Sequence, residues 1–462
     1  MIDDHFRQSR QNIIIGLILT TQELYPEEQL KISYSILNGI YFELDNSPLS
    51  SREVTHIEEG LEKWIARDIP IQCVPEPSYY SCTCSGKTIQ TLYPSFDSSG
   101  KVDNFKLVHY PPGFILLLSR TEENTCIPTV FIPPKKLSAT FKESQQWVEK
   151  LQLSRVNEIN AMISEGHAKD LVLISEAVQE KYLSNIADVI LRSHDHLKII
   201  LISGPSSSGK TTFTQRLSVQ LRVNGLQPVP ISLDDYFLAR EDTPLDEHGQ
   251  PDFESLYALD LQQLNSDLQR LIKGERVDLP VFDFFVGRRK AEGRPLQLNP
   301  DHVLVIEGIH GLNPNLIPSF DQNQLYKIYI SAIFPLNLDF YNHIPTTETR
   351  LIRRIVRDNQ FRGSKPDRTL SQWDSVRRGE TNYIFPYQEE ANVMFNSSLL
   401  YELNALRPFA EPLLQAIPEV HIYHTSAQRL LRLLSFFVPV DVGFIPSNSL
   451  LREFTGGSLF YT

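Results

Sequence analysis

The fold is decided by Ile199-Ile200-Leu201-Ile202-Ser203-Gly204-Pro205-Ser206-Ser207-Ser208-Gly209-Lys210-Thr211-Thr212. The four apolar residues at its start predict a buried strand. The loop that follows fits the pattern G-x-x-x-x-G-K-[ST], and apolar residues then recur at helical spacing, at Phe213, Leu217 and Leu221. Because strand, loop and helix are the context that this pattern requires, we interpret the stretch as a phosphate-binding loop rather than a Ser- and Gly-rich turn.

The residue types in the loop match the chemistry of holding a phosphate. Gly204 and Gly209 allow backbone N–H groups to point at phosphate oxygens, and the following helix adds the positive end of its dipole. Lys210 would reach the β- and γ-phosphates of a nucleotide, and the Thr211 hydroxyl would bind Mg²⁺. The residues predicted to bind the nucleotide are Gly204, Pro205, Ser206, Ser207, Ser208, Gly209, Lys210, Thr211 and Thr212.

The composition narrows the classes of partner and compartment. With 44 Lys and Arg against 56 Asp and Glu, the 462-residue chain has a formal net charge of −12, which argues against a general nucleic-acid or membrane-surface binder. Four cysteines are too few for a disulfide framework, so we expect a reducing, cytoplasmic environment. The first residues are acidic where a signal peptide would be basic, and the apolar run 13–19 is too short to cross a bilayer.

Four parts are predicted along the chain: an α+β domain over 1–135, a helical connector over 136–193, a phosphate-loop domain over 194–430 and a tail over 431–462. The phosphate-loop domain is expected to be α/β, with a mostly parallel sheet and helices on both faces. In the first part, Cys82 and Cys84 are expected to be thiols rather than zinc ligands, because no other Cys or His lies at finger spacing.

Hairpins and helices are expected at definite places in residues 1–135. Ser50 and Glu53 form a capping box that begins a helix to about residue 67. The Asn38-Gly39 pair is a strong turn signal between two alternating strands. The predicted ranges are a helix over 13–24 and strands over 30–36, 40–44, 105–109 and 114–118.

Two carboxylates follow predicted strands beyond the loop. Asp234 follows the apolar run 229–233, and Glu307 follows 303–306. Ligands of open parallel α/β sheets bind outside the carboxyl ends of the strands, which puts Asp234 beside the phosphate loop. One carboxylate would take a proton from an attacking hydroxyl and the other would hold Mg²⁺ through water. The alternative is a helix cap and a solvated loop acid.

An arginine cluster lies between residues 349 and 362. Arg350, Arg354 and Arg357 share one helical face, and Arg353 and Arg362 complete the group. Such a run of charge is usually a solvated face. In a phosphate-binding domain, however, it favours a lid whose arginines close on the oxygens of a transferring phosphoryl group.

The assembled motifs resemble the phosphoribulokinase/uridine kinase family over about residues 195–430. They are the phosphate loop, 232–237, 280–284, 305–309 and the arginine helix, in the family's order. The resemblance implies that Asp234 is the base that activates a nucleoside 5′-hydroxyl, that Glu307 acts on the metal side, and that Arg350 and Arg357 are catalytic substrate and lid arginines. Substrate-binding positions are assigned accordingly to Asp234, Glu254 (on the ribose hydroxyls), Phe282 (against the base), Asp283, Arg288 and Arg350.

The sequence also departs from the family pattern. Gly287 stands where uridine–cytidine kinases carry a histidine that reads the pyrimidine edge. Segments 376–380, 384–396 and 452–458 are similar to a bacterial subfamily in which the kinase-like domain is fused to a region resembling the editing domain of threonyl-tRNA synthetase. The H-x-x-x-H motif of that editing domain does not occur in the sequence, so neither editing activity nor zinc is carried over.

The expected activity is ATP-dependent phosphorylation of a hydroxyl of a nucleoside or related ribose compound, with Mg²⁺. One alternative is a phosphoribulokinase-like sugar-phosphate kinase, in which Arg288, Arg289 and Lys290 would grip the phosphate of the substrate. Another is a nucleotide-binding regulator whose N-terminal half binds tRNA. The expected partner is a small molecule and not a membrane, and an oligomer is compatible with the sequence.

Overall fold

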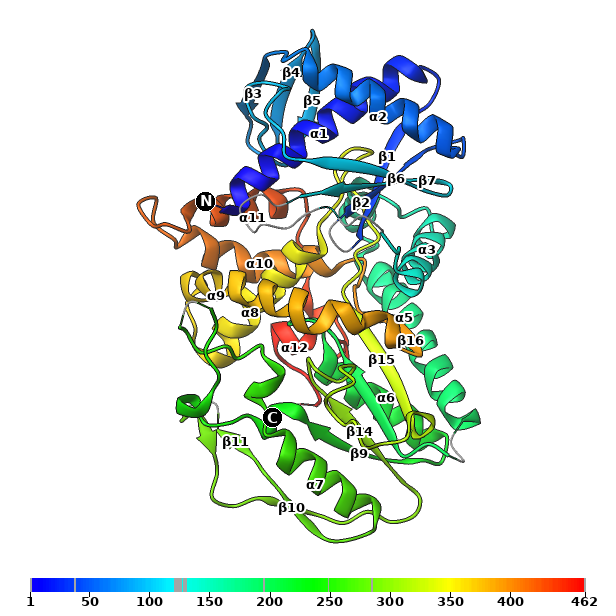
Figure 1. Ribbon diagram of the computed structural model, residues 1–462, viewed down its shortest axis with the longest axis vertical. Coiled ribbons are helices and arrows are strands. Elements are labelled where there is room, and N and C mark those ends of the chain that lie inside the picture. Colours follow the sequence, from blue (N-terminus) through cyan, green and yellow to red (C-terminus); the bar gives the residue numbers. More distant parts are fainter. Residues whose placement is uncertain are drawn as a thin grey trace. The chain divides into compact units, whose positions relative to one another are not determined.

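The computed structural model describes residues 2–36, 39–119, 127, 131–193, 196–247, 249–283 and 286–460 (Figure 1). The packing of the chain divides it into two units. The first holds Met1–Ala168, Phe334–Thr349 and Leu403–Val440, and the second holds Lys169–Ile333, Arg350–Glu402 and Asp441–Thr462. Each unit therefore draws on segments that are far apart in the sequence.

The first unit contains two antiparallel sheets, ordered β1-β2-β7-β6 and β3-β4-β5. The strands are β1 (Leu30–Ile36), β2 (Gly39–Leu44), β3 (Ile71–Pro75), β4 (Tyr80–Cys84), β5 (Lys87–Thr91), β6 (Phe105–Tyr110) and β7 (Gly113–Leu118). The helices of this unit are α1 (Ile2–Leu24), α2 (Ser51–Ala66), α3 (Lys135–Lys150), α4 (Val156–Ser164), α10 (Glu402–Gln415, whose first residue belongs to the second unit) and α11 (His424–Ser435). The predicted α+β character of this region is therefore confirmed, although the β3–β5 sheet was not foreseen.

Helix α2 begins at the predicted capping box. Ser50 Oγ accepts from the Glu53 backbone N–H at 3.3 Å, and a Glu53 carboxylate oxygen accepts from the Ser50 backbone N–H at 2.7 Å. Its buried residues, Val54, Ile57, Leu61 and Trp64, follow helical spacing. A Cβ on Gly16 of α1 would lie 2.6 Å from Leu61 and Trp64 atoms, so glycine is what lets the two helices approach.

The second unit is built on a five-stranded sheet in the order β16-β15-β8-β14-β9, and every pairing in it is parallel. The strands are β8 (Ile199–Ser203), β9 (Gln227–Ser232), β14 (His302–Glu307), β15 (Leu325–Ser331) and β16 (Val393–Asn396). Two short ribbons pair β10 (Val277–Leu279) with β13 (Arg294–Leu296) and β11 (Phe282–Asp283) with β12 (Arg288–Arg289). The predicted parallel α/β fold is confirmed.

The helices of the second unit are α5 (Ala168–Arg192), α6 (Lys210–Val223), α7 (Leu261–Ile272), α8 (Thr346–Arg362), α9 (Pro366–Gly379) and α12 (Arg452–Thr455); Ala168 of α5 and residues 346–349 of α8 belong to the first unit. Leu264, Leu268 and Leu271 of α7 share one buried cluster with Ile199 and Leu201 of β8. All of β8 is buried, as its unbroken apolar run predicted.

The cysteines differ from expectation. Cys73 and Cys82 are cross-strand partners on β3 and β4 and form a disulfide, while Cys84 is a buried free thiol. The expectation that Cys82 is a free thiol is therefore wrong, because strand pairing brings Cys73 opposite it. Because the chain contains a disulfide, its cysteines no longer support the expectation of a reducing compartment. The Asn38 half of the predicted turn lies outside the described residues, but β1 and β2 do pair as a hairpin, with Ile36 opposite Gly39.

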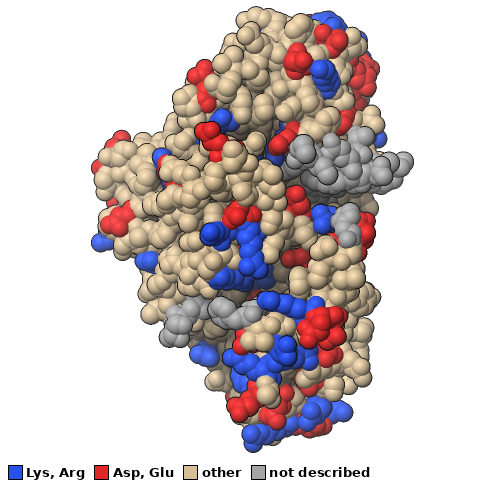
Figure 2. Space-filling model, turned by 90° about the vertical axis from the view of Figure 1, so that its left-hand side faces the viewer, with Lys and Arg blue, Asp and Glu red and all other residues tan. Residues whose placement is uncertain are grey.

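On the face shown in Figure 2, charge of both signs is present, and basic side chains gather in the middle and lower parts of the view. None of the helices within the described ranges combines the length and apolar character that crossing a bilayer requires.

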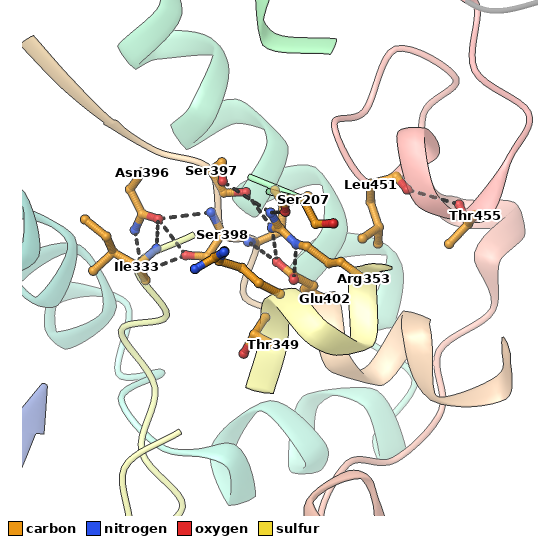
Figure 3. Close-up of polar contacts among 12 residues, drawn as sticks. Ser207, Ile333, Thr349, Arg353, Asn396, Ser397, Ser398, Glu402, Leu451 and Thr455 are labelled. Carbon is orange, nitrogen blue, oxygen red and sulfur yellow. Dashed lines mark hydrogen bonds and ion pairs between the residues drawn. The ribbon is translucent and has the colours of Figure 1, made fainter. Parts of the chain in front are cut away.

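A buried ion pair joins α8 to the start of α10 inside the second unit (Figure 3). Arg353 and Glu402 are both fully buried, and the guanidinium donates to the two carboxylate oxygens at 2.5 and 2.6 Å. The same guanidinium donates to Ser397 O at 2.9 Å and to Ser207 O, in the phosphate loop, at 3.3 Å. The pair therefore connects a helix, a strand end and the loop.

We expect Arg353→Met to lower the free energy of unfolding by about 3–5 kcal/mol, because it leaves the Glu402 carboxylate buried without its cation. Chemical denaturation measures the change. The double variant Arg353→Met/Glu402→Leu should recover much of the loss, and Arg368→Met, at an exposed position of α9, is the control. A loss below about 1 kcal/mol, the range of exposed pairs, would show that the pair is not buried in solution.

Candidate active site

The phosphate loop joins β8, in the middle of the sheet, to α6. β8 lies between β14 and β15, and the loop leaves its carboxyl end. Gly209 has a φ of 87°, in the left-handed region that favours glycine, and directly precedes α6. A Cβ on Gly204 would lie 2.1 Å from the Ile330 carbonyl oxygen. The strand, loop and helix predicted from the sequence are therefore present, with glycine where the backbone requires it.

Lys210 lies across the loop. Its Nζ donates to the carbonyl oxygens of Gly204, at 2.9 Å, and Pro205, at 3.2 Å. Burial lowers the pKa of Lys210, and the carboxylates of Glu307 and Asp234 oppose that shift. The structure thus brings together the lysine and both of the carboxylates that the sequence singled out.

Glu307 ends β14 beside Thr211. Thr211 Oγ1 donates to Glu307 Oε1 at 3.4 Å, and Ser232 Oγ donates to the same oxygen at 3.3 Å. Burial raises the pKa of Glu307 to about 7; Asp234 adds to the shift and Lys210 opposes it. A carboxylate and a hydroxyl are oxygen donors of the kind Mg²⁺ takes, so Thr211 and Glu307 fit that ion.

A cation at this place would need further ligands from outside the chain. Within the described residues, no three His, Cys, Asp or Glu side chains come together as a metal site. Because Mg²⁺ is usually bound by one or two carboxylates together with substrate phosphates and waters, this donor set is sufficient for it.

The segment after β9 turns at once. Leu233–Tyr236 form a 3₁₀ turn, and the Ser232 side chain accepts from the Asp234 backbone N–H at 3.3 Å. The apolar run 229–233 is therefore not extended to its end, because a serine cap closes the turn one residue earlier. Asp234 and Asp235 therefore both lie in the 3₁₀ turn, and the alternation of side chains along a strand does not apply to them.

The two aspartates have different surroundings. Asp235 Oδ1 accepts from the Phe282 backbone N–H at 3.1 Å, so it ties the turn to β11. The charge of Asp234 raises the pKa of Glu307 and of Glu254, which places it electrostatically among the site residues. The charge of Asp234 therefore acts on Lys210, Glu254 and Glu307.

Glu254 lies near the same groups. Its Oε2 is buried and makes no hydrogen bond within the described residues. Burial raises the pKa of Glu254 to about 7, while Arg354 and Lys210 oppose the shift. The position predicted for the ribose hydroxyls therefore holds an acid with an open hydrogen-bonding oxygen.

His310 was missed by sequence reasoning. It follows Glu307 by three residues, is 1% exposed, and neither ring nitrogen makes a hydrogen bond within the described part of the chain. Burial lowers the pKa of His310 to about 4, opposed by the backbone of Ser255 and Glu254. A neutral imidazole thus lies beside Glu254, and its place just after a strand-end carboxylate was the only signal for it.

The arginines of α8 are not equivalent. Arg350 and Arg353 are buried, and Arg350 donates to the Ser206 carbonyl oxygen at 3.0 Å and pairs with Glu380. Arg357 bonds its neighbour Asp358 at 3.2 Å. Arg357 is also the largest of the causes that lower the pKa of Arg362, to about 10, ahead of burial. The helix therefore presents crowded positive charge at Arg357 and a buried support for the loop at Arg350.

The ribbon β11–β12 holds the remaining predicted substrate positions. Phe282 and Asp283 pair with Arg289 and Arg288. The Phe282 ring packs edge-on against the Phe237 ring, with 5.9 Å between the ring centroids. Arg289 is occupied, since it donates to Tyr236 O at 2.9 Å and Gln263 Oε1 at 2.5 Å.

Gly287, in the turn of this ribbon, has a φ of 79°, and a Cβ there would lie 2.4 Å from Arg240 Nε. Backbone and space both disfavour a histidine at this position. Phe284, the end of the quoted motif, lies outside the described residues.

A residue from the C-terminal segment also touches the loop. Glu453 of α12 accepts from the Thr212 backbone N–H at 3.1 Å and from Thr212 Oγ1 at 2.9 Å. Glu453 and Glu380 were not assigned roles from the sequence, although both lie in the segments quoted for the subfamily resemblance. Their partners in the phosphate loop, Thr212 and Ser206, are more than 150 residues away along the chain, so no local pattern reveals these contacts.

Comparisons with known proteins agree with this geometry. The sequence model of the phosphoribulokinase / uridine kinase family matches residues 199–400. Uridine kinases of Deinococcus deserti and Brevibacillus brevis are each 27% identical over 197 residues, which is 42% of this chain and 86% and 83% of those proteins.

Among solved structures, a putative fructose transport system kinase from Silicibacter sp. TM1040 is 18% identical with a TM-score of 0.34, and covers 46% of this chain and 98% of that one. A possible uridine kinase from Bacillus stearothermophilus is 21% identical with a TM-score of 0.28, and covers 46% and 100%. The segment that the phosphoribulokinase / uridine kinase family model matches, 199–400, contains the loop, both strand-end carboxylates and the arginine helix.

Proposed function

We propose that the protein is an ATP-dependent kinase that transfers a phosphoryl group to a hydroxyl of a nucleoside or a related ribose compound. The observation that carries the proposal is the meeting of Lys210, Glu307 and Asp234 at the carboxyl edge of one parallel sheet. Phosphoryl transfer needs a cradle for the phosphates, a site for Mg²⁺ and a base for the acceptor, and these residues supply one of each.

Each residue has a defined task in this proposal. Lys210 and the loop N–H groups bind the phosphates, and Asp234 accepts the proton of the attacking hydroxyl. Thr211 and Glu307 would hold Mg²⁺, which neutralises phosphate charge when it is bound. Arg357 faces the developing negative charge, and Glu254, whose Oε2 is open, receives the acceptor's other hydroxyls.

The contacts of Arg289 favour this substrate class over a sugar phosphate. Its guanidinium is held by Tyr236 O, Gln263 and Asp260 and so is not open to a ligand's phosphate. The raised pKa of Glu254 likewise favours an uncharged, hydroxyl-bearing acceptor beside it.

The test is a screen of nucleosides and sugar phosphates with ATP and the purified protein, with ³¹P NMR to identify the product. We expect a nucleoside 5′-monophosphate. Transfer to sugar phosphates alone would support the phosphoribulokinase-like alternative. ATP binding without transfer to any acceptor would support the nucleotide-binding regulator, whose N-terminal half would then be tested for tRNA binding.

The Mg²⁺ requirement should depend on pH. Because burial raises the pKa of Glu307 to about 7, the carboxyl group is neutral below that pH and must lose its proton to hold the ion. We expect the apparent Mg²⁺ affinity to fall about tenfold per pH unit below 7, which is the slope for one released proton. Activity titrations at several pH values measure it, with Glu307→Gln as the variant that should lose the slope. An affinity that stays constant from pH 5.5 to 8 would exclude Glu307 as the metal-side acid.

A further inference from the structure

Ser206 of the phosphate loop is held at three of its atoms by buried charged side chains. Its backbone N–H donates to Glu380 Oε1 at 3.2 Å. Its carbonyl oxygen accepts from Arg350 Nε at 3.0 Å, and its hydroxyl accepts from Arg354 at 2.9 Å. The first half of the loop is therefore fixed from outside and not by the loop's own turn alone.

Glu380 is the centre of this arrangement. It is 0% exposed, and it begins a π-helical turn, Glu380–Ile384, directly after α9. Oε1 pairs with Arg350, and Oε2 accepts from Arg377 at 2.9 Å. One carboxylate thus neutralises two guanidinium groups and still binds the N–H of Ser206. A single turn of π-helix of this kind is frequent at functional sites.

Gly379, the residue before Glu380, lies against Glu254, on the acceptor side of the proposed site. Its φ of −59° is ordinary helical backbone, so conformational freedom does not explain the glycine. Space does, because a Cβ there would lie 2.2 Å from Glu254 Cβ and 2.7 Å from Glu254 Cγ. The absence of a side chain at Gly379 therefore allows Glu254 to pack directly against the end of α9.

We propose that Gly379 and Glu380 are positioning residues that place the two sides of the site from one point of the chain: Glu380 orients the phosphate loop through Ser206, and Gly379 makes room for Glu254. The Gly379 half rests on the proposed function, since it takes Glu254 as the acceptor-side residue. The Glu380 half depends only on the loop binding a nucleotide.

The experiment compares Glu380→Gln and Gly379→Ala in the full chain by calorimetric ATP binding and by steady-state kinetics. Glu380→Gln removes the charge that orients Arg350 against Ser206, so ATP affinity should fall about tenfold or more while the KM for the acceptor changes less than about twofold. Gly379→Ala pushes Glu254 aside, so the acceptor KM should rise about tenfold or more with ATP affinity nearly unchanged. Gln372→Ala, at an exposed position of α9, is the matched control.

This split between two adjacent residues is what a merely structural role would not produce. If both variants alter the same constant, or neither alters its own, the proposal is overturned. Should Glu380→Gln fail to fold, Glu380→Asp keeps the charge but shortens its reach, and must still weaken ATP binding without changing the acceptor KM. If the wild-type protein binds ATP but phosphorylates no acceptor, the proposed function fails, and the Glu380 arm is still decided by ATP affinity.

Discussion

Lys210→Ala is expected to lose phosphoryl transfer while the protein stays folded. The Lys210 Nζ donates to the carbonyl oxygens of Gly204 and Pro205, and water can replace these two hydrogen bonds when the side chain is removed. The substitution removes the lysine that the proposed function assigns to the phosphates, and groups that clamp transferring phosphoryl oxygens contribute about 10³-fold or more to kcat. Unfolding should change little, because burial opposes the charged form of this side chain and its loss relieves that cost.

The measurement is single-turnover transfer, with thermal unfolding as the check on folding. Lys290→Ala is the control, because Lys290 is exposed and would matter only if the chain gripped a sugar phosphate. Transfer by Lys210→Ala at near the wild-type rate would mean that the loop is not the ATP site.

Asp234→Asn is expected to separate binding from chemistry. Asparagine keeps the size and most of the hydrogen bonding of Asp234 but cannot accept the proton of the acceptor hydroxyl. We expect kcat to fall by about 10²- to 10⁴-fold, the range for loss of a general base, with a much smaller change in the acceptor KM. ATP affinity should stay close to wild type, because Lys210 and the loop backbone hold the phosphates.

Asp235→Asn is the matched comparison. The Oδ1 of Asp235 accepts from the Phe282 N–H, and an asparagine oxygen can accept the same bond, so this variant should be mild. A dead Asp235→Asn beside a normal Asp234→Asn would move the base by one residue. Near wild-type rates in both would remove the general base from this strand end.

What could be predicted from the sequence is what the backbone dictates locally. The backbone of the phosphate loop requires glycine at Gly204 and Gly209. The unbroken apolar run of β8 requires a strand buried on both faces, which is typical of a parallel sheet. The parallel sheet, and a ligand site at the carboxyl ends of its strands, could therefore be predicted. The capping box at Ser50 followed for the same reason, since both of its bonds lie within three residues.

The rest depends on contacts between distant residues. Cys73 and Cys82 pair only because β3 and β4 do, and short, half-exposed strands carry a weak pattern. The burial of Arg350 and Arg353 could not be read from a charged helix, because the carboxylates that permit it, Glu380 and Glu402, lie 30 and 49 residues further on. The only signal for His310 is its place three residues after Glu307, because the burial of its ring is visible only once its neighbours are placed.

The bond between Glu453 and Thr212 changes what a nucleotide affinity would mean for this chain. A helix N-terminus built to hold an anion has unsatisfied N–H groups whenever it is empty, and here the chain fills one of them with its own carboxylate. Any phosphate that takes the Thr212 N–H must first dislodge Glu453. The measured dissociation constant of the nucleotide then describes the exchange of one anion for another. It reports the difference in free energy between the hydrogen bonds that the phosphate forms and those that Glu453 of α12 loses.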